Sequence, residues 1–365
     1  MRNTFGNTVT VTLFGESHGP AVGAVIDGLP AGLPVDTALM EKRMMLRHGD
    51  PAVSTARREP DTVLFESGVF RGHTTGSPLC LRIENRDVND TPYEEIGTLA
   101  RPSHADYPLY ARYGEWADRR GGGHASGRLT APLVAAGAIA ETALAGIGVS
   151  AATQILSLGN LTGRRFSLRP EKELSVRDLA LPTLDETFFH QIKEAVSAAK
   201  AESKSLGGVT ETVICGLPAG VGEPFFDTLE GMLAHAAFAV PAVKGIAFGD
   251  GFDLTHRTAP ETNDTLYSEN GEIRHATNHM GGIDGGMSNG NPVVFTCAVK
   301  PTPSVSVAQK TVELTTGEER EITVTGRHDP AVITRVSPVL TAVAELTVLD
   351  MLCTRFGTDF IIKTL

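Results

Sequence analysis

The chain has few aromatic residues and few cysteines, and the scarcity of cysteine argues against some classes of protein. Aromatic residues make up 6% of its 365 residues, with a single Trp. Cys80, Cys215, Cys297 and Cys353 are far apart and form no C-x-x-C pair, which argues against a disulfide scaffold and a cysteine-based zinc site. No run of about 18 uncharged apolar residues occurs, and the N-terminus lacks the apolar segment of a secretory signal. These absences predict a cytoplasmic protein with reduced thiols and no membrane span.

Positive charge is also scarce, which argues against a nucleic-acid or membrane-surface partner. Lys and Arg total 32 against 43 Asp and Glu, so the net charge is -11. Two segments depart from this balance: residues 42–58 hold five basic residues against one acidic residue, and residues 101–128 hold five arginines against three acids. Because a guanidinium binds phosphate and carboxylate through paired hydrogen bonds, these basic islands predict a small polyanionic ligand.

Glycine, by contrast, is abundant, with 39 residues. Gly121-Gly122-Gly123 lies in the second basic island, and residues 281–290 contain five glycines. Such loops let backbone N–H groups approach a phosphate or a flat cofactor. The 281–290 loop contains no G-x-G-x-x-G and the chain has no Gly-Lys pair, which excludes a Rossmann fingerprint there and a Walker A loop anywhere.

Hydrophobic periodicity predicts an α+β fold. Strands are expected at 7–13, 22–26, 62–66, 78–83, 209–215 and 293–299, and helices at 37–47, 129–145, 184–203, 226–238 and 331–356, the last bent near Pro338. Residues 101–128 read as a polar loop. In most of the predicted strands apolar and polar residues alternate, which favours antiparallel sheets with one covered face. No linker divides residues 1–365, so one large domain is expected.

Gly15-Glu16-Ser17-His18-Gly19 matches G-x-S-x-G, the nucleophile elbow of serine hydrolases. A tight strand-to-strand loop is the alternative, because only one strand precedes Ser17 and no HGGG-type motif is present. In that loop His18 is the better candidate for acid–base chemistry.

Two further motifs place a histidine beside an arginine. Arg101-Pro102-Ser103-His104-Ala105-Asp106 lies in the second basic island, and Arg327-His328-Asp329-Pro330 precedes the last helix. Asp329 fits a helix N-cap, while the helix start also suits an anionic ligand. His275 and His279 lack the Glu of H-E-x-x-H, so no metal site is expected.

Taken together, these segments resemble the chorismate synthase family. The order and spacing hold from about residue 4 to about residue 355. The matching segments are 15–19, 25–30, 57–61, 74–76, 101–106, 121–123 with Ser126 and Arg128, 220–224, 243–245, 281–290, 300–302 and 326–330.

The resemblance implies two four-stranded antiparallel sheets packed with surrounding helices, in a homotetramer. It implies the last step of the shikimate pathway, a 1,4-anti elimination of phosphate from 5-enolpyruvylshikimate 3-phosphate that gives chorismate. It also implies reduced FMN as the cofactor, although no net redox change occurs, with NADPH as a candidate reductant of that flavin.

The resemblance assigns three groups of residues. His18 is expected to be the acid that meets the departing phosphate, His104 to lie beside flavin N1, and Asp329 to lie near N5 and assist removal of the C6 proton. The expected substrate-binding residues are Arg47, Arg57, Arg101 and Arg128. The expected flavin-binding residues are His124, Ala125, Ser126, Pro241, Ala242, Gly285, Lys300, Pro301, Thr302, Pro303, Ser304 and Arg327.

Three segments depart from the family's usual sequences. Residues 45–49 replace the usual Arg-Arg-Arg-Pro-Gly and keep only one of its arginines. Arg47 is therefore expected to bind an anionic group of the substrate, and Arg43 to lie at the rim of the site. Arg-Ser-Ser-Ala-Arg-Glu-Thr is replaced by residues 124–130, and Ser-Ile-Asn-Ala by 239–242. Three interpretations stay open: an active enzyme, which is favoured, a catalytically silent flavin- or ligand-binding relative, and a serine hydrolase built on Ser17.

Overall fold

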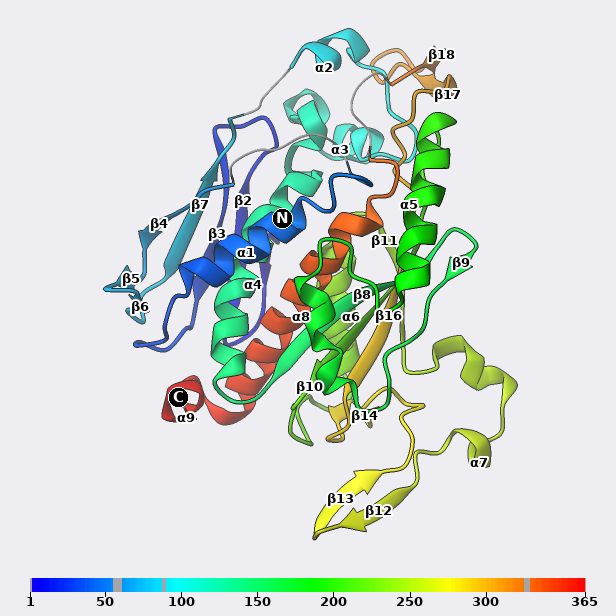
Figure 1. Cartoon of the computed structure of the whole chain (residues 1–365). Helices are drawn as coiled ribbons and strands as arrows, with labels where there is room; N and C mark the ends of the chain where they lie inside the picture. Colours follow the sequence, from blue (N-terminus) through cyan, green and yellow to red (C-terminus); the bar gives the residue numbers. More distant parts are fainter. Residues whose placement is uncertain (1, 55–60, 87–89, 325–328, 365) are drawn as a thin grey trace.

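Two long helices form the middle of the molecule, and an antiparallel sheet packs on each side of them (Figure 1). The computed structural model describes residues 2–54, 61–86, 90–324 and 329–364. Helix α4 (Thr130–Ala145) covers the first sheet, helix α8 (Ile333–Phe356) covers the second, and the two helices pack on each other. The order of layers is therefore sheet, helix, helix, sheet.

The first sheet has the strand order β1-β2-β3-β7-β4. Its strands are β1 (Thr4–Phe5), β2 (Thr10–Gly15), β3 (Ala21–Asp27), β7 (Leu79–Glu84) and β4 (Val63–Ser67). Strand β7 alternates strictly, burying Leu79, Leu81 and Ile83 toward α4. That alternation is why the sheet has one covered face and one open face.

The second sheet has the order β11-β16-β10-β8-β9. Its strands are β11 (Val243–Phe248), β16 (Val293–Val299), β10 (Gly208–Cys215), β8 (Ser150–Leu158) and β9 (Leu161–Thr162). Each main sheet thus contains four longer strands and a two-residue edge strand, β1 or β9. The predicted fold class is confirmed, with the strand count of each sheet corrected from four to five.

The central helices can approach closely because they are rich in small side chains. A Cβ on Gly137 of α4 would lie 2.3 Å from the Cβ of Ala342 on α8. By length and composition α8 could cross a membrane, but 94% of its most apolar window is buried inside the structure, as in a core helix. Helix α8 continues through Pro338, which cannot donate a hydrogen bond to the Thr334 carbonyl.

The remaining elements surround this core. Helix α1 (Thr37–Arg47) packs on α4 and α8, and α6 (Leu229–Ala239) packs on α8 and β11. The other helices are α2 (Thr91–Ile96), α3 (Asp106–Tyr113), α5 (Glu186–Ala201), α7 (Ala259–Thr262) and α9 (Asp359–Thr364). Short hairpins pair β5 (Val69–Phe70) with β6 (His73–Thr74), β12 (Leu266–Glu269) with β13 (Glu272–His275), β14 (Ile283–Asp284) with β15 (Met287–Ser288), and β17 (Gln309–Val312) with β18 (Glu319–Ile322).

The prediction of a continuous loop over residues 101–128 is wrong. Helix α3 lies within that segment, followed by three 3-10 turns at Gly114–Trp116, Arg120–Ala125 and Gly127–Leu129. Only Asp106 is buried in α3, so the segment lacks the apolar face that marks a helix in sequence.

Candidate active site

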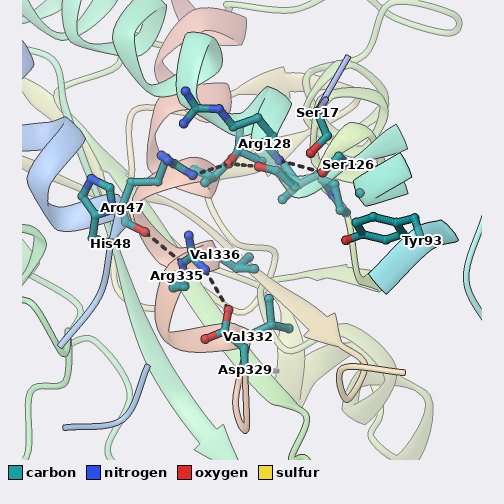
Figure 2. A pocket seen from close by; sticks show the side chains of 16 residues that line it. Ser17, Arg47, His48, Tyr93, Ser126, Arg128, Asp329, Val332, Arg335 and Val336 are labelled. Atoms are coloured by element: carbon teal, nitrogen blue, oxygen red, sulfur yellow. Dashed lines mark hydrogen bonds and ion pairs between the residues drawn. The ribbon is translucent and has the colours of Figure 1, made fainter. Parts of the chain in front are cut away.

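A cavity of about 240 Å³ opens where the loop after β2, the end of α1, the turns before α4 and the start of α8 meet (Figure 2). Arginine and histidine side chains line one part of it and valines line another. The lining residues are Ser17, Arg47, His48, Tyr93, Gly121, Ser126, Gly127, Arg128, Thr130, Val240, Pro241, Asp329, Val332, Arg335, Val336 and Val339.

Helix α1 supplies Arg47 to this cavity from its last turn. Arg47 is 4% exposed, pairs with Asp61 through Nη2, and directs Nη1 to the Thr130 hydroxyl at 3.4 Å. Its buried Nε has no hydrogen-bond partner among the described residues. Burial lowers the pKa of Arg47, and Arg335 and Arg128 lower it further against the attraction of Asp61. Positive charge is therefore only partly compensated here.

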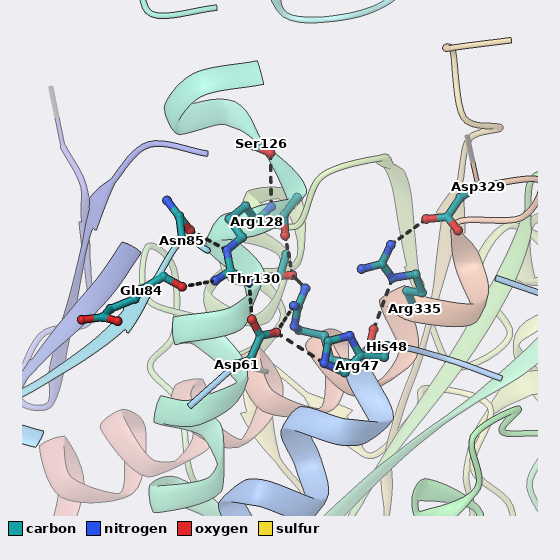
Figure 3. Close-up of polar contacts among 11 residues, drawn as sticks. Arg47, His48, Asp61, Glu84, Asn85, Ser126, Arg128, Thr130, Asp329 and Arg335 are labelled. Carbon is teal, nitrogen blue, oxygen red and sulfur yellow. Dashed lines mark hydrogen bonds and ion pairs between the residues drawn. The ribbon is translucent and has the colours of Figure 1, made fainter. Parts of the chain in front are cut away.

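Asp61 joins two of the cavity arginines (Figure 3). Its side chain is 1% exposed, and its two oxygens accept from Arg47 and Arg128. Burial alone would raise the pKa of Asp61, but the two guanidinium groups outweigh burial and hold the pKa below its usual value. Sequence analysis missed Asp61 as a site residue, although an acid at the end of a basic island was a signal.

Arg128, which was predicted to bind the substrate, lines the cavity and is held in place from several sides. Its Nε donates to Asn85 Oδ1 at 2.8 Å and its Nη2 to the Glu84 carbonyl at 3.1 Å. The Ser126 hydroxyl accepts from its backbone N–H at 3.3 Å, which caps the 3-10 turn before α4. These bonds fix the direction of the guanidinium before any ligand arrives.

Asp329 lines the cavity, and its carboxylate pairs with Arg335, a residue that was not predicted. Arg335 Nη1 donates to Asp329 Oδ2 at 2.8 Å, and Arg335 Nε donates to the Arg47 carbonyl at 3.3 Å. The N-cap of α8 is Val332, so the alternative of Asp329 as the N-cap is wrong. Arg335 thus links the start of α8 to the end of α1.

The two predicted catalytic histidines pack against consecutive residues of the glycine run, His18 against Gly121 and His104 against Gly122. Gly121 has φ of 57°, and a Cβ there would lie 2.3 Å from His18 Nδ1 and Cε1. A Cβ on Gly122 would lie 3.2 Å from His104 Cε1. The Ser17 N–H donates to the Gly123 carbonyl at 3.1 Å. Glycine is required at 121 because any side chain would displace His18.

His18 is a buried side chain that packs edge-on to Tyr93. The ring centroids are 4.9 Å apart at 81°, and His18 Nε2 lies 3.9 Å from Asp90 Oδ1. Tyr93 was not predicted, because nothing in sequence relates α2 to the loop after β2.

Arg101 does not line the cavity, and its side chain is engaged elsewhere. Its Nε and Nη2 each donate to Asp106 at 2.7 Å, and its guanidinium lies 5.5 Å from the Tyr93 ring centre. Although burial opposes the shift, Arg101 and His104 lower the pKa of Asp106 well below its usual range. His104 Nδ1 lies 3.5 Å from Asp106 Oδ1. Arg101 therefore orients the acid beside His104.

Ser17 lies in a turn that does not suit a nucleophile elbow. The turn connects β2 to β3, which pair with each other as antiparallel neighbours, whereas an elbow leads from a strand into a helix. The strand-to-strand alternative is the one observed.

A second network lies one turn back along α1. Arg43 donates to both oxygens of Glu141 at 2.7 Å and to Asp178 at 2.6 Å. Arg177 approaches Glu141 at 3.0 Å and Glu345 of α8 at 3.6 Å. Burial, with a contribution from Glu141, raises the pKa of Glu345 well above its usual value. Arg43 is 7% exposed, so its expected position at the rim is wrong.

A larger, more apolar cavity of about 400 Å³ adjoins the first and shares Ser126, Thr130 and Pro241 with it. Strand β1, α4, α6 and α8 contribute its apolar wall, and His124 and Ala125 also line it. His124 Nδ1 lies 2.7 Å from the Gly15 carbonyl. Two adjoining cavities, one basic and one apolar, suit a polyanionic ligand and a flat aromatic group.

Comparisons with known proteins decide the family. The family profile described as chorismate synthase matches residues 9–353. The chorismate synthase of Methanocella arvoryzae is 42% identical over 351 residues, covering 96% of this chain and 94% of that protein. The chorismate synthase of Pyrococcus abyssi is 40% identical over 350 residues, covering 96% and 97%.

The chain belongs to the chorismate synthase family. A crystal structure of chorismate synthase shares the fold with a TM-score of 0.77 and 24% identity, and covers 98% of this chain and 96% of that one. The family resemblance seen in the sequence is thereby confirmed.

Some residues expected from the family do not line either cavity, including the predicted catalytic residues His18 and His104, although Ser17 and Gly121 next to His18 line the first cavity. Gly285 is in the turn between β14 and β15. Lys300 to Ser304 follow β16, and Lys300 Nζ donates to the Ser103 carbonyl at 2.7 Å, next to His104. Ala242, with a left-handed φ of 75°, accepts from the Lys300 N–H at 2.9 Å. Arg57 and Arg327 lie outside the described residues.

A metal site would require a group of side chains that can ligate the ion. Within residues 2–54, 61–86, 90–324 and 329–364, no group of three or more His, Cys, Asp or Glu is placed to hold a metal ion.

Proposed function

We propose that this chain catalyses the elimination of phosphate from 5-enolpyruvylshikimate 3-phosphate to give chorismate, in a lyase reaction. The observation that carries the proposal is the cavity itself, which gathers the guanidinium groups of Arg47, Arg128 and Arg335 and contains a buried Arg47 Nε without a hydrogen-bond partner among the described residues. The substrate bears two carboxylates and a phosphate, which are the groups that guanidinium donors bind. Membership of the chorismate synthase family supports the same reaction.

We propose reduced FMN as the cofactor, and the described residues fit it. The adjoining apolar cavity of about 400 Å³ offers room for a ring system, and His124 and Ser126 give its wall polar groups. His124, Ala125, Ser126 and Pro241 would hold the flavin there, with Ala242 and the segment from Lys300 to Ser304 nearby. When bound, the reduced ring supplies electron density to the carbon centre that the departing phosphate leaves electron-poor.

The bond changes define what the protein must do. The carbon–oxygen bond to phosphate breaks and the phosphate leaves with the bonding pair, while C6 loses a proton, so the carbon skeleton undergoes no net redox change. Fixed arginines stabilise the charge that develops on the phosphate, because they are oriented before the reaction begins.

The proposed proton carriers are the two histidines and Asp329. His18 donates a proton to the departing phosphate, and its burial against Tyr93 keeps water from its ring. With the flavin bound, His104 would supply a proton, and the carboxylate of Asp106, 3.5 Å from its Nδ1, would orient its ring. Asp329 assists removal of the C6 proton, with Arg335 fixing the direction of its carboxylate.

An anaerobic assay tests the proposal. The chain is incubated with substrate and chemically reduced FMN, and phosphate and chorismate are measured in parallel, with oxidised FMN as the matched control. We expect equal amounts of both products with reduced FMN and none with oxidised FMN. Flavin and substrate binding without phosphate release would instead indicate a catalytically silent relative, and turnover without any flavin would refute the cofactor.

Three further expectations remain proposals. NADPH as the flavin reductant is tested by following flavin bleaching without a separate reductase. A homotetramer is tested by light scattering, and a cytoplasmic location by cell fractionation.

A further inference from the structure

His48 is a cavity residue that the proposed mechanism does not use. It forms the C-cap of α1, with its backbone N–H donating to the Met45 carbonyl at 3.1 Å. Its ring lies beside Arg47 on the cavity wall (Figure 2). A cation is favourable at a helix C-terminus, because the last carbonyls carry partial negative charge.

The charged groups facing His48 come from four segments. Arg47 lies on its own helix, Asp61 follows the first basic island, Arg128 precedes α4, and Arg335 belongs to α8. His48 Nε2 lies 3.5 Å from Asp61 Oδ2, but that carboxylate is shared with two arginines. Burial lowers the pKa of His48, and Arg47, Arg335 and Arg128 lower it further against the pull of Asp61. Burial and the three arginines therefore disfavour the imidazolium form of His48 more than Asp61 favours it.

An anion in the cavity reverses this balance. A phosphate or carboxylate placed among the arginines cancels the positive potential that disfavours an imidazolium. A neutral imidazole offers one N–H donor, whereas the imidazolium offers two. The same ligand that removes the repulsion thus gains a hydrogen bond when the ring is protonated.

We propose that His48 takes up a proton when an anionic group of the substrate enters the cavity, and that the imidazolium then donates a hydrogen bond to that group. The inference rests on the proposed function, because that substrate supplies the phosphate and carboxylates. By linkage, substrate affinity must weaken as the pH rises, and each unit by which the ligand raises the titration midpoint of His48 corresponds to about a tenfold change.

Calorimetry of the full chain loaded with oxidised FMN tests the proposal. Substrate is titrated at several pH values between 7 and 8.5, above the second pKa of about 6 of a phosphate ester, in buffers of different ionisation enthalpy. Inorganic phosphate and shikimate serve as separate probes for the phosphate and the carboxylate. We expect the wild-type chain to take up roughly 0.5 proton or more beyond the uptake by His48→Gln at its lower pH values. Affinity should fall with pH in the wild type and stay flatter in His48→Gln.

Two further variants complete the test. His48→Lys keeps a cation at all these pH values, so its affinity should lose the pH dependence without the weakening seen in His48→Gln. His190→Gln, a substitution of an exposed histidine on α5, should behave as the wild type. Equal proton uptake in the wild type and His48→Gln, with substrate bound in both, would overturn the role of His48 while leaving the proposed function intact. A wild-type chain that neither binds nor converts substrate would overturn both.

Discussion

Arg43 and Arg47 lie one helical turn apart on α1, yet the structure predicts opposite consequences for their loss. Arg43 is held by Glu141 and Asp178 and does not line the first cavity, whereas Arg47 lines it and keeps a buried Nε without a partner among the described residues. We expect Arg43→Ala to lower stability while substrate affinity stays within about threefold of the wild type. We expect Arg47→Ala to act mainly on substrate affinity.

The contacts give the magnitudes. Removing one partner of a buried ion pair costs about 3–5 kcal/mol, because the remaining charge is left uncompensated. With an unfolding entropy of about 2.1 cal/mol/K per residue over 365 residues, that loss lowers Tm by about 4–7 °C for Arg43→Ala. Arg47→Ala leaves Asp61 paired with Arg128, so the stability loss should be smaller. Its substrate Kd should rise at least about 30-fold, which corresponds to about 2 kcal/mol.

Calorimetry separates the two effects. Thermal unfolding gives Tm, and titration of substrate into the flavin-loaded variants gives Kd. Arg47→Lys should recover part of the affinity, because an ammonium keeps the charge but cannot form the planar fork. Equal losses of affinity in Arg43→Ala and Arg47→Ala, with equal Tm values, would refute the assignment of Arg47 to the substrate.

Three other predictions concern the buried Glu345, the two predicted catalytic histidines and Gly121. The pKa of the buried Glu345 carboxyl is raised above its usual 4.5, so this group keeps a proton in the folded chain that it releases in the unfolded chain. Between pH 4.5 and the pKa of the folded state, each pH unit therefore lowers the free energy of unfolding by about 1.4 kcal/mol. Glu345→Gln should therefore raise Tm more at pH 8 than at pH 5, and an advantage that shrinks with pH would contradict this reasoning. His18→Ala and His104→Ala should each slow turnover by about 10²–10⁴-fold while flavin still binds; near-normal rates would make either ring structural. Gly121→Ala should slow turnover as severely as His18→Ala, because the new Cβ displaces that ring, and wild-type turnover would show that His18 moves freely.

Elements with a strong local pattern could be predicted from sequence. The bounds of α1 and β16 match the predicted ranges 37–47 and 293–299, because each has a regular apolar pattern and a clear end signal. Helix α1 begins after Asp36, whose side chain accepts from the Leu39 N–H at 2.9 Å. The same logic fails for α3, where only Asp106 is buried and periodicity carries no information about packing.

Only site residues that lie within a recognisable sequence motif could be proposed from the sequence. His18, Arg47, Arg128 and Asp329 could be proposed because they stand in recognisable segments. Their partners could not, because Asn85, Arg335 and Tyr93 reach them only after strands and helices distant in sequence have packed. Arg335 left one faint signal, because it is a charged residue in the otherwise uncharged beginning of α8.

Arginine count alone also cannot separate ligand-binding residues from structural ones. Arg101 and Arg43 look as available as Arg47 in sequence, yet each has carboxylate partners within the fold. What distinguishes them is how tertiary structure divides the carboxylates. Arg43 meets Glu141 and Asp178, and Arg101 meets Asp106, whereas Arg47 shares Asp61 with a second arginine, Arg128.

Helix α1 connects these two kinds of arginine. Positions four apart lie on the same helix face about 6 Å apart along the axis, so fixing Arg43 against α4 also fixes the position from which Arg47 enters the cavity. Arg335 adds a second restraint by donating to the Arg47 carbonyl from α8. This second restraint does not depend on Arg43, so the end of α1 stays anchored to α8 when the pair with Glu141 is lost. That is why we expect Arg43→Ala to lower Tm while substrate affinity changes little.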